Sequence, residues 1–542
     1  MTALATLISF LRERSLLSAP WLIAMALTAG VTNALILGVL NAGAASAVRG
    51  GPLDGFALAF VAVTVAYVVA QRQLFERTSG EVERILHRFR MEQLARVRRT
   101  DLDAIERIGS ARIYDCLTRQ PDILSSAAGS VILGLQSALI VVVTLAYIAW
   151  LKPAACVLAV LVLAIGGMFA RNRLRRAEAV LRDADRAQGD VFDALTDLIH
   201  GLKEVRLHAG RRAALARFID DVSARLSGLR TAAETRLSES YLLLQATFYY
   251  AAAAMVFVLP GLGVTSRADT MQTMTAALFL IGPLTAVAAS ASAMARARAA
   301  CEALLDLDRQ LTAAADRTPA SSRDLGGFAE IELSDVVYQH QEAGQAGFRV
   351  GPLTLVLHRR DVLFISGGNG AGKSTLLKLL TSLYRPQAGL IRVDGQPVGG
   401  ALRDAYQNLF AAVFADFHLF RRLHGLSHVA PEDVERWLER MEIADKVRVE
   451  DGQWHTIRLS SGQRRRLALV VAALEDRPIY VFDEWAADQD PSFRQKFYDE
   501  ILPLLRARDK TIVAVTHDER YLDRATRHLR MDEGRLSEVA RD

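Results

Sequence analysis

The stretch Arg477–Pro491, RPIYVFDEWAADQDP, joins an apolar run to two adjacent carboxylates. The run Ile479–Phe482 has the composition of a strand buried on both faces of a parallel sheet, which places Asp483 and Glu484 at the strand's carboxyl end. Ligands of open α/β sheets bind at that edge. Taken alone, such a run is more often a core strand followed by an acidic loop, so the interpretation depends on residues upstream.

A glycine-rich segment upstream fits the phosphate-binding pattern GxxxxGK[ST]. It lies between a strand-like run, 362–365, and a helix-like run, 376–380. In that context backbone N–H groups and the helix N-terminus bind phosphate, Lys373 reaches the terminal phosphates and Ser374 offers a hydroxyl to Mg²⁺. The expected ATP-binding residues of this loop are Gly367, Gly368, Asn369, Gly370, Ala371, Gly372, Lys373, Ser374 and Thr375.

Once a phosphate loop is present, the two adjacent acids take separate roles. Asp483 and Ser374 are the expected protein ligands of Mg²⁺, because magnesium keeps several waters and needs few protein groups. Glu484 is the expected general base that polarises the attacking water. His517 follows a second buried-strand pattern, 511–515, and its place at a strand end favours a role in the site. The predicted catalytic residues are therefore Glu484, His517 and Lys373.

The order of these motifs, from about Gly327 to the C-terminus, resembles the nucleotide-binding domain of ABC transporters. The sequence LSSGQ differs by one letter from that family's LSGGQ signature, and it precedes a helix-like run. The resemblance implies that the signature closes over ATP held by another subunit, and that Asp490 is the D-loop residue. It also implies that His517 contacts the γ-phosphate and that Tyr338 stacks on adenine, although Tyr338 is also open to being a strand aromatic. The signature residues are Leu459, Ser460, Ser461, Gly462 and Gln463.

One position departs from the family pattern. Where ABC exporters carry the Q-loop glutamine, the alignment places Ala415, followed by Asp416. Either Asp416 replaces the glutamine near magnesium, or the loop only couples movement, and the sequence leaves both open. The segment 421–458 before the signature is also shorter than the helical subdomain usual in the family.

The N-terminal half predicts a membrane domain. Six stretches without a charged residue are near or above the roughly 17–25 residues that cross hydrocarbon. Lys and Arg number 11 in segment 72–122 and 14 in segment 171–239, but the other connections carry only Arg49, Lys152 and Arg267. The two long loops, both chain ends and the ATPase domain are therefore expected to be cytoplasmic. The expected spans are about 17–42, 55–73, 123–150, 153–172, 240–262 and 271–295, of which 153–172 is also open to being a re-entrant or interfacial helix.

These patterns predict a membrane all-α domain of six helices fused to a cytoplasmic α/β P-loop NTPase domain. The expected division is a transmembrane domain at 1–307, a linker at 308–326 and a nucleotide-binding domain at 327–542. The net charge of +5 is explained by the arginines of the cytoplasmic loops, so no nucleic-acid partner is expected.

Both long loops carry apolar residues at helical spacing, which indicates helices that pack on other helices. At the turns of these loops, about 99–114 and 201–209, lie the segments that the resemblance identifies with coupling helices resting on the ATPase domain. One chain supplies half of the family's working unit, so the resemblance implies a homodimer with two ATP sites.

The sequence segments FDEWAADQDP, GQRRRLAL and FADFHLF resemble those of the cyclic peptide and siderophore exporter subfamily, which includes exporters of pyoverdine precursors. The resemblance implies an ATP-hydrolysing half-transporter that exports a cyclic peptide, siderophore or siderophore precursor across the bacterial cytoplasmic (inner) membrane. A multidrug or lipid exporter or flippase is the near alternative, and a non-hydrolysing ATP-gated membrane sensor is the distant one. Polar groups inside spans are expected to face the bundle interior, either lining a cargo cavity or bonding between helices: Asn33, Gln136, Gln245, Tyr249 and Tyr250.

Overall fold

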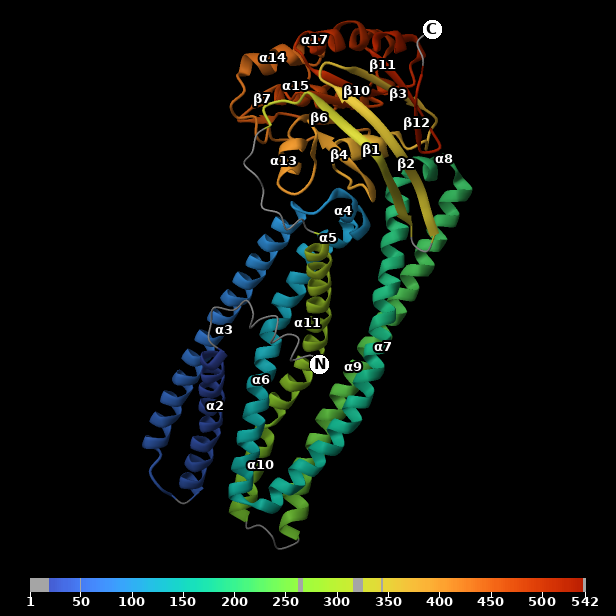
Figure 1. Ribbon diagram of the computed structural model, residues 1–542. Coiled ribbons are helices and arrows are strands. Elements are labelled where there is room, and N and C mark those ends of the chain that lie inside the picture. Colours follow the sequence, from blue (N-terminus) through green and yellow to red (C-terminus); the bar gives the residue numbers. More distant parts are fainter. Residues whose placement is uncertain (1–18, 49, 262–266, 315–324, 343–344, 540–542) are drawn as a thin grey trace. The chain divides into compact units, whose positions relative to one another are not determined.

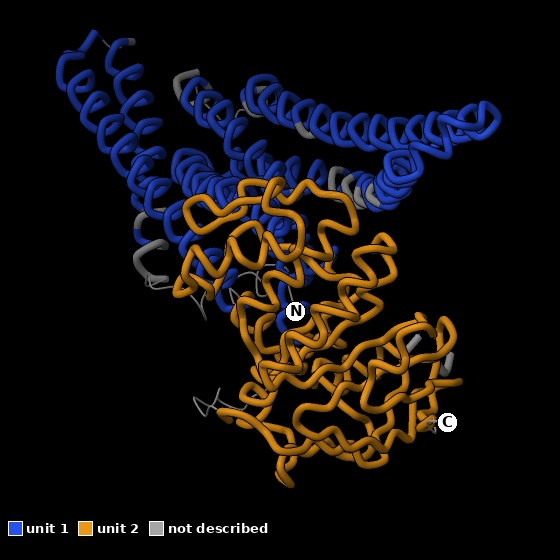
Figure 2. The backbone as a smooth tube through the Cα atoms, turned by 90° about the horizontal axis from the view of Figure 1, so that it is seen from above, with its two compact units in different colours: residues 1–93, 111–309 blue, residues 94–110, 310–542 orange. Residues whose placement is uncertain are grey.

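The computed structural model describes residues 19–48, 50–261, 267–314, 325–342 and 345–539. The chain divides into two compact units, coloured separately in Figure 2: residues 1–93 with 111–309, and residues 94–110 with 310–542. The first unit is helical, and the second contains the β-sheets. The division between Arg309 and Gln310 falls within the linker expected at 308–326, while the short segment Leu94–Ser110 belongs to the second unit.

Long helices make up the first unit (Figure 1). A helix rises about 1.5 Å per residue, so the longest of them extend well beyond the roughly 30 Å of membrane hydrocarbon. The helices from the N-terminus onward are α2 (Ala19–Val48), α3 (Asp54–Val97), α5 (Ser110–Leu117), α6 (Arg119–Leu151), α7 (Pro153–His200), α8 (Leu202–Leu207), α9 (Ala209–Gly261), α10 (Arg267–Phe279) and α11 (Ile281–Ala314). The last residues of α3 and α11 and the first residue of α5 belong to the second unit.

Among the described residues, five helices are long and apolar enough to cross a membrane. Helix α7 begins with a further apolar stretch, Pro153–Phe169, which is shorter than these five among the residues described. The six predicted spans thus correspond to five full candidates and one shorter apolar segment. The shorter segment lies in the predicted span 153–172, which was also open to being a re-entrant or interfacial helix. Residues 17, 18 and 262 of the predicted spans lie outside the described residues. The five candidates are Thr28–Ala47, Asp54–Val97, Ser110–Leu151, Ala209–Val258 and Met271–Ala314.

Small residues allow the helices of the first unit to approach closely. A Cβ added at Gly134 on α6 would lie 2.1 Å from the side chain of Ser290 on α11, so only glycine fits there. Close approach at small residues is a main source of helix association in membranes. The longest pair, α7 and α9, runs side by side (Figure 1).

The second unit contains a six-stranded sheet in the order β12-β11-β3-β10-β9-β6 and a four-stranded antiparallel sheet in the order β2-β1-β4-β5. In the six-stranded sheet only the edge strand β12 is antiparallel to its neighbour. The strands are β1 (Glu330–Glu342), β2 (Gln345–His358), β3 (Val362–Gly367), β4 (Ala388–Val393), β5 (Gln396–Pro397), β6 (Phe410–Val413), β7 (Val449–Glu450), β8 (Gln453–Trp454), β9 (Ile479–Asp483), β10 (Thr511–Val515), β11 (Arg527–Asp532) and β12 (Arg535–Glu538).

Helices complete the second unit, and its sheet separates two apolar cores. Phe482 of β9 lies in one core and Val481 in the other, as expected for a central strand whose successive side chains point to opposite faces. Every residue of β9 is buried, which confirms the prediction made from Arg477–Pro491. The α-helices are α4 (Leu102–Ile108), α12 (Lys373–Leu380), α13 (Leu402–Gln407), α14 (Pro431–Arg440), α15 (Ser461–Glu475), α16 (Pro491–Lys496) and α17 (Leu502–Ala507). Two short 3-10 helices, η1 (Trp485–Asp488) and η3 (Glu519–Arg524), and one short π-helix, η2 (Phe497–Ile501), are also described.

Candidate active site

Parallel pairing brings the predicted motifs to one edge of the six-stranded sheet. Ile365 of β3 pairs with Val515 of β10, and Val515 pairs with Asp483 of β9. The phosphate loop, the two acids and His517 lie at or directly after these paired positions. The sheet therefore gathers, at the carboxyl ends of three strands, residues that are far apart in the sequence.

The loop between β3 and α12 has the shape that phosphate binding needs. Gly367 and Gly372 have φ of 149° and 100°, and a Cβ on Gly367 would lie 2.1 Å from the carbonyl oxygen of Met531. Both positions therefore require glycine. Lys373 is only 6% exposed, and its amino group donates to the carbonyl oxygens of Gly367 and Gly368 at 3.1 and 3.0 Å. The loop thus wraps around its own lysine.

Glu484, His517 and Lys373 form a contact group. One carboxylate oxygen of Glu484 lies 3.0 Å from Nε2 of His517 and 3.5 Å from Nζ of Lys373. Partial burial by itself would raise the pKa of Glu484, but the hydrogen bond with His517 and the charge of Lys373 outweigh it and hold the pKa below its ordinary value. Glu484 is therefore ionised at neutral pH, as a general base must be.

Asp483 lies beside the loop in a different environment. Burial raises the pKa of Asp483, against hydrogen bonds from the Ser374 hydroxyl and the backbone N–H of Ala415. Its Oδ1 is buried and has no hydrogen-bond partner among the described residues. An unpartnered carboxylate oxygen next to a serine hydroxyl fits the ligand set that Mg²⁺ takes from proteins.

The Q-loop position lies next to this acid. Ala415 and Asp416 form a turn directly after β6, and β6 pairs with β9 through Val413 and Phe482. The negative charge of Asp416 contributes to the raised pKa of Asp483. The structure thus places Asp416 near the acid, while its own side chain is exposed.

Tyr338 is not accessible in the described structure. Its ring is 3% exposed and stacks on Tyr384 with centroids 4.8 Å apart, and its hydroxyl donates to Asp103 of α4 at 2.6 Å. The more accessible ring is that of His340, which is half-buried and lies 3.0 Å from the hydroxyl of Thr375 in the phosphate-loop helix. Tyr338 and His340 are two positions apart in β1, so alternation alone would place both rings on one face and does not identify which of them faces the loop.

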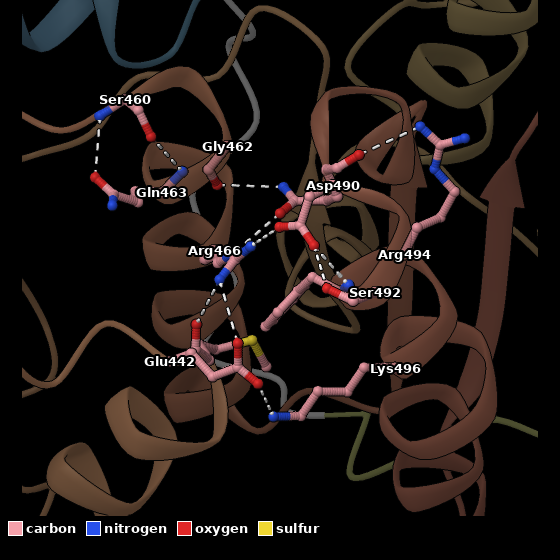
Figure 3. A network of polar contacts seen from close by, with 12 residues as sticks. Glu442, Ser460, Gly462, Gln463, Arg466, Asp490, Ser492, Arg494 and Lys496 are labelled. Atoms are coloured by element: carbon pink, nitrogen blue, oxygen red, sulfur yellow. Dashed lines mark hydrogen bonds and ion pairs between the residues drawn. The ribbon is translucent and has the colours of Figure 1, made fainter.

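The signature sequence begins helix α15. Ser460 is the N-cap: its hydroxyl accepts from the Gln463 N–H, and the Gln463 side chain accepts from the Ser460 N–H (Figure 3). Gln489 donates to the carbonyl oxygen of Gly462 at 3.2 Å. The predicted signature residues are thus an ordered helix start, with Ser460 and Ser461 exposed.

The predicted D-loop residue Asp490 caps α16 and is tied to the signature helix. Its carboxylate accepts from the backbone N–H of Phe493 at 2.9 Å and pairs with Arg466 of α15 at 2.6 Å (Figure 3). Arg466 also faces Glu442, which pairs with Lys496. Hydrogen bonds from Ser492 and from Phe493, together with Arg466, lower the pKa of Asp490 to about 2.

Acids of the segment 94–110 contact side chains in and around helices α12 and α13 of the second unit. Asp101 pairs with Arg385 at 2.6 Å and with Arg403. Glu106 accepts from Lys378 of α12 at 3.0 Å and from Tyr384. The first of the two loop turns expected to rest on the ATPase domain therefore folds with that domain, as a short helix α4.

The polar residues proposed for a cargo cavity have mixed surroundings. Gln136 is 1% exposed and donates to Gln71 of α3 at 2.7 Å, the bond between helices that was the alternative explanation. Gln245 donates to Tyr249 on the same helix at 3.0 Å, and Asn33 is half-buried. Tyr249 and Tyr250 are exposed.

Sequence reasoning missed several polar contacts. Asn41 on α2 is buried and donates to Tyr147 and to the carbonyl oxygen of Gln272, both at 3.3 Å. Its position within a span was a usable signal. The roles of His340 and of the acids of α4 depend on contacts distant in sequence, for which no local pattern exists.

The fold and site define a P-loop nucleotide hydrolase joined to membrane-spanning helices. The ABC transporter family matches residues 350–487. ATP-binding protein SyrD of Pseudomonas syringae pv. syringae is 32% identical over 83% of this chain and 82% of its own length. An ATP-dependent lipid A-core flippase of Burkholderia orbicola (strain AU 1054) is 24% identical over 88% of this chain and 83% of its own length.

The same fold occurs in a solved structure described as a bacterial Atm1-family ABC exporter with ATP bound. It has a TM-score of 0.75 and 19% identity, and the match covers 97% of this chain and 94% of that chain. This chain belongs to the ABC transporter family. It is an ATP-binding, transport-coupled ATPase with an exporter fold, a multi-pass protein of the inner membrane whose ATPase domain is cytoplasmic.

Asp490 provides a test of the contacts around the D-loop. Asp490→Ala removes both the helix cap and the pairing with Arg466, so we expect the free energy of unfolding at pH 7 to fall by about 1 kcal/mol. Asp490→Asn keeps a capping oxygen and should cost less. Because the folded pKa of about 2 lies below the ordinary 3.8, the carboxylate stabilises the fold above pH 4 and loses this effect as the pH falls towards 2. The gap between parent and Asn variant, measured by thermal unfolding, should shrink over this pH range; a constant gap would contradict the assignment.

Proposed function

We propose that the protein hydrolyses ATP as a homodimer and uses the cycle to export a peptide-like molecule, of the cyclic peptide or siderophore class, by alternating access. Glu484 acts as the general base, with its carboxylate held ionised by His517 and Lys373. The phosphate-loop residues 367–375 bind ATP, and Ser374 with Asp483 hold Mg²⁺, which would neutralise charge on the phosphates.

The observation that carries this proposal is the attachment of α4 to the helix of the phosphate loop. Lys378 and Thr375 both belong to α12, which begins at the phosphate-loop lysine. The amino group of Lys378 donates to the carboxylate of Glu106 on α4. The hydroxyl of Thr375 lies within hydrogen-bond distance of His340. The rings of His340 and Tyr338 are in edge contact, with centroids 5.1 Å apart. Because α4 follows α3 in the chain, the proposal is that movement of the phosphate loop reaches the membrane helices through this connection.

The exposed start of the signature helix supports the proposed homodimer. The exposed signature start at Ser460 and Ser461 offers a helix N-terminus to an anion, and an isologous contact would present it to the ATP of a second copy. Binding of ATP then favours the closed dimer, and hydrolysis removes that preference. In this arrangement Asp490 would lie at the partner subunit.

The adenine contact is assigned to the strand β1. Tyr338 remains the predicted stacking residue, but its burial under Tyr384 means that its ring would have to be uncovered. His340, already half-buried beside Thr375, is the alternative ring for the same contact.

The cargo proposal rests first on the amino-acid sequence around Trp485–Gln489, which resembles that of cyclic peptide and siderophore exporters. It rests also on two exposed tyrosines, Tyr249 and Tyr250, because aromatic rings with hydroxyl groups suit peptide surfaces. A lipid cargo is the second candidate, because relatives about 24% identical are named lipid A-core flippases. Two further alternatives are an exporter of several drugs and a membrane sensor that binds ATP without hydrolysing it.

Glu484→Gln is the test of the catalytic assignment. The substitution keeps the size of the side chain and removes the base, so we expect kcat for ATP to fall by about 100-fold or more, while ATP binding persists. The purified variant should accumulate as an ATP-bound closed dimer, measured by nucleotide retention and size-exclusion chromatography with light scattering. The matched control is Glu500→Gln, an exposed acid of the same unit, which should leave turnover unchanged. Parental turnover in Glu484→Gln would exclude the general-base role of this residue.

Asp416→Ala tests the Q-loop position. If Asp416 contributes charge to the Mg²⁺ site, its removal should raise the Mg²⁺ concentration for half-maximal turnover by about 10-fold, with less change at saturating Mg²⁺. Asp416→Asn, which keeps an oxygen and loses the charge, separates ligation from electrostatics. Asp523→Ala is the control for an exposed acid away from the loop. If the Mg²⁺ dependence of turnover is unchanged in both variants, Asp416 does not act at the Mg²⁺ site and has only a structural role in the loop.

The cargo is tested by comparing molecules exported by parental and deletion cells. Loss of a cyclic peptide or siderophore from the medium, restored by the intact gene and not by Glu484→Gln, is the expected result. An unchanged peptide profile with altered lipid distribution between membrane leaflets would favour the lipid candidate instead.

A further inference from the structure

Arg465 of the signature helix makes three contacts with the segment after β9. Its guanidinium donates to the backbone carbonyl oxygen of Glu484 and pairs with Asp488, with 3.0 Å between Nε and Oδ2. Its own carbonyl oxygen accepts from the indole N–H of Trp485 at 2.9 Å. Helix α15 thus both donates hydrogen bonds to residues 484–488 and accepts a hydrogen bond from them.

The surroundings of these contacts are largely buried on the side of α15 and Trp485, while the carboxylate of Asp488 stays half-exposed. The side chain of Arg465 is 12% exposed, so its charge has lost most of its water and depends on the two oxygens it meets. Trp485 is 1% exposed and stacks on Phe497 with centroids 4.4 Å apart. A shift of α15 would therefore have to carry the segment 484–488 with it or leave buried polar groups without partners.

The backbone of Glu484 is in an unusual conformation at this point. Its φ and ψ are 50° and 34°, in the left-handed region that side chains other than glycine seldom adopt. The N–H of Glu484 donates to the carbonyl oxygen of Val515 at 3.2 Å, and its own carbonyl oxygen accepts from the guanidinium of Arg465 and from the backbone N–H of Ala487. With both backbone groups bound, the direction of the side chain towards His517 and Lys373 is set.

We propose that Arg465 is a positioning residue that fixes the backbone of Glu484 and so ties the orientation of this carboxylate to the placement of the signature helix. The proposal rests on the general-base role given to Glu484 under the proposed function. In the proposed homodimer the start of α15 meets the partner's ATP, so closure on one ATP adjusts the base that serves the other. Arg465 then links the two sites without touching either nucleotide.

Steady-state ATPase of the purified full chain, with Arg465→Gln, tests this role. We expect kcat to fall roughly 10- to 100-fold, because a displaced base loses alignment with its water, while KM for ATP stays within about twofold, because the phosphate loop is intact. Arg465→Lys keeps a cation beside Asp488 and should recover part of kcat. Arg464→Gln is the matched control: the neighbouring residue on the same helix is exposed, and kcat should not change.

A double variant separates positioning from a merely structural role. In the Glu484→Gln background, Arg465→Gln should have no further effect on residual hydrolysis, since the group through which it acts is gone. An equal fall in both backgrounds, or a rise in KM that matches the fall in kcat, would overturn the proposal. If Arg465→Gln does not fold, as judged by thermal unfolding, Asp488→Asn takes its place: a lower kcat at constant KM supports the role, and an unchanged kcat refutes it. Failure of the general-base assignment is recognised separately, by parental turnover in Glu484→Gln alone.

Discussion

The parallel pairing of β9 with β10, and of β10 with β3, is the constraint on which the site depends. In parallel strands the carboxyl ends meet at one edge, so a register fixed by buried residues such as Val481 and Val513 also fixes the positions of the residues after each strand. A one-residue slip of β9 would turn Phe482 and Val481 to the wrong cores. The acids at 483 and 484 are thus placed by apolar packing of the strand that precedes them.

Sequence was sufficient for those parts of the fold and site that depend on local pattern. The strand β9, the phosphate loop and the strand end before His517 are short runs with fixed spacing, and each occurs where it was expected. The membrane helices were also recognisable, because a charge-free run of sufficient length has few alternative structures.

The remaining features depend on contacts that no local pattern contains. Glu106 and Lys378 are 272 positions apart, and the sequence around neither residue predicts a contact with the other. Tyr338 and His340 are two positions apart, so alternation along β1 places both on one face and cannot tell them apart. For Gln136 the sequence allowed a cavity or a bond between helices, and only the position of Gln71 distinguishes them. These are cases in which tertiary pairing overrides what propensity and spacing predict.

The length of α7 has a mechanical consequence. Its 48 residues form one helix that packs along α9 for much of its course, so the pair resists bending better than either helix alone. At about 1.5 Å per residue the helix is about 72 Å long, and a tilt of about 5° at one end displaces the other by about 6 Å. Rotations small enough to preserve side-chain packing around one end therefore become displacements comparable to a helical turn at the other. The helix acts as a lever arm, and the stiffness of the pair determines how much of the displacement is transmitted.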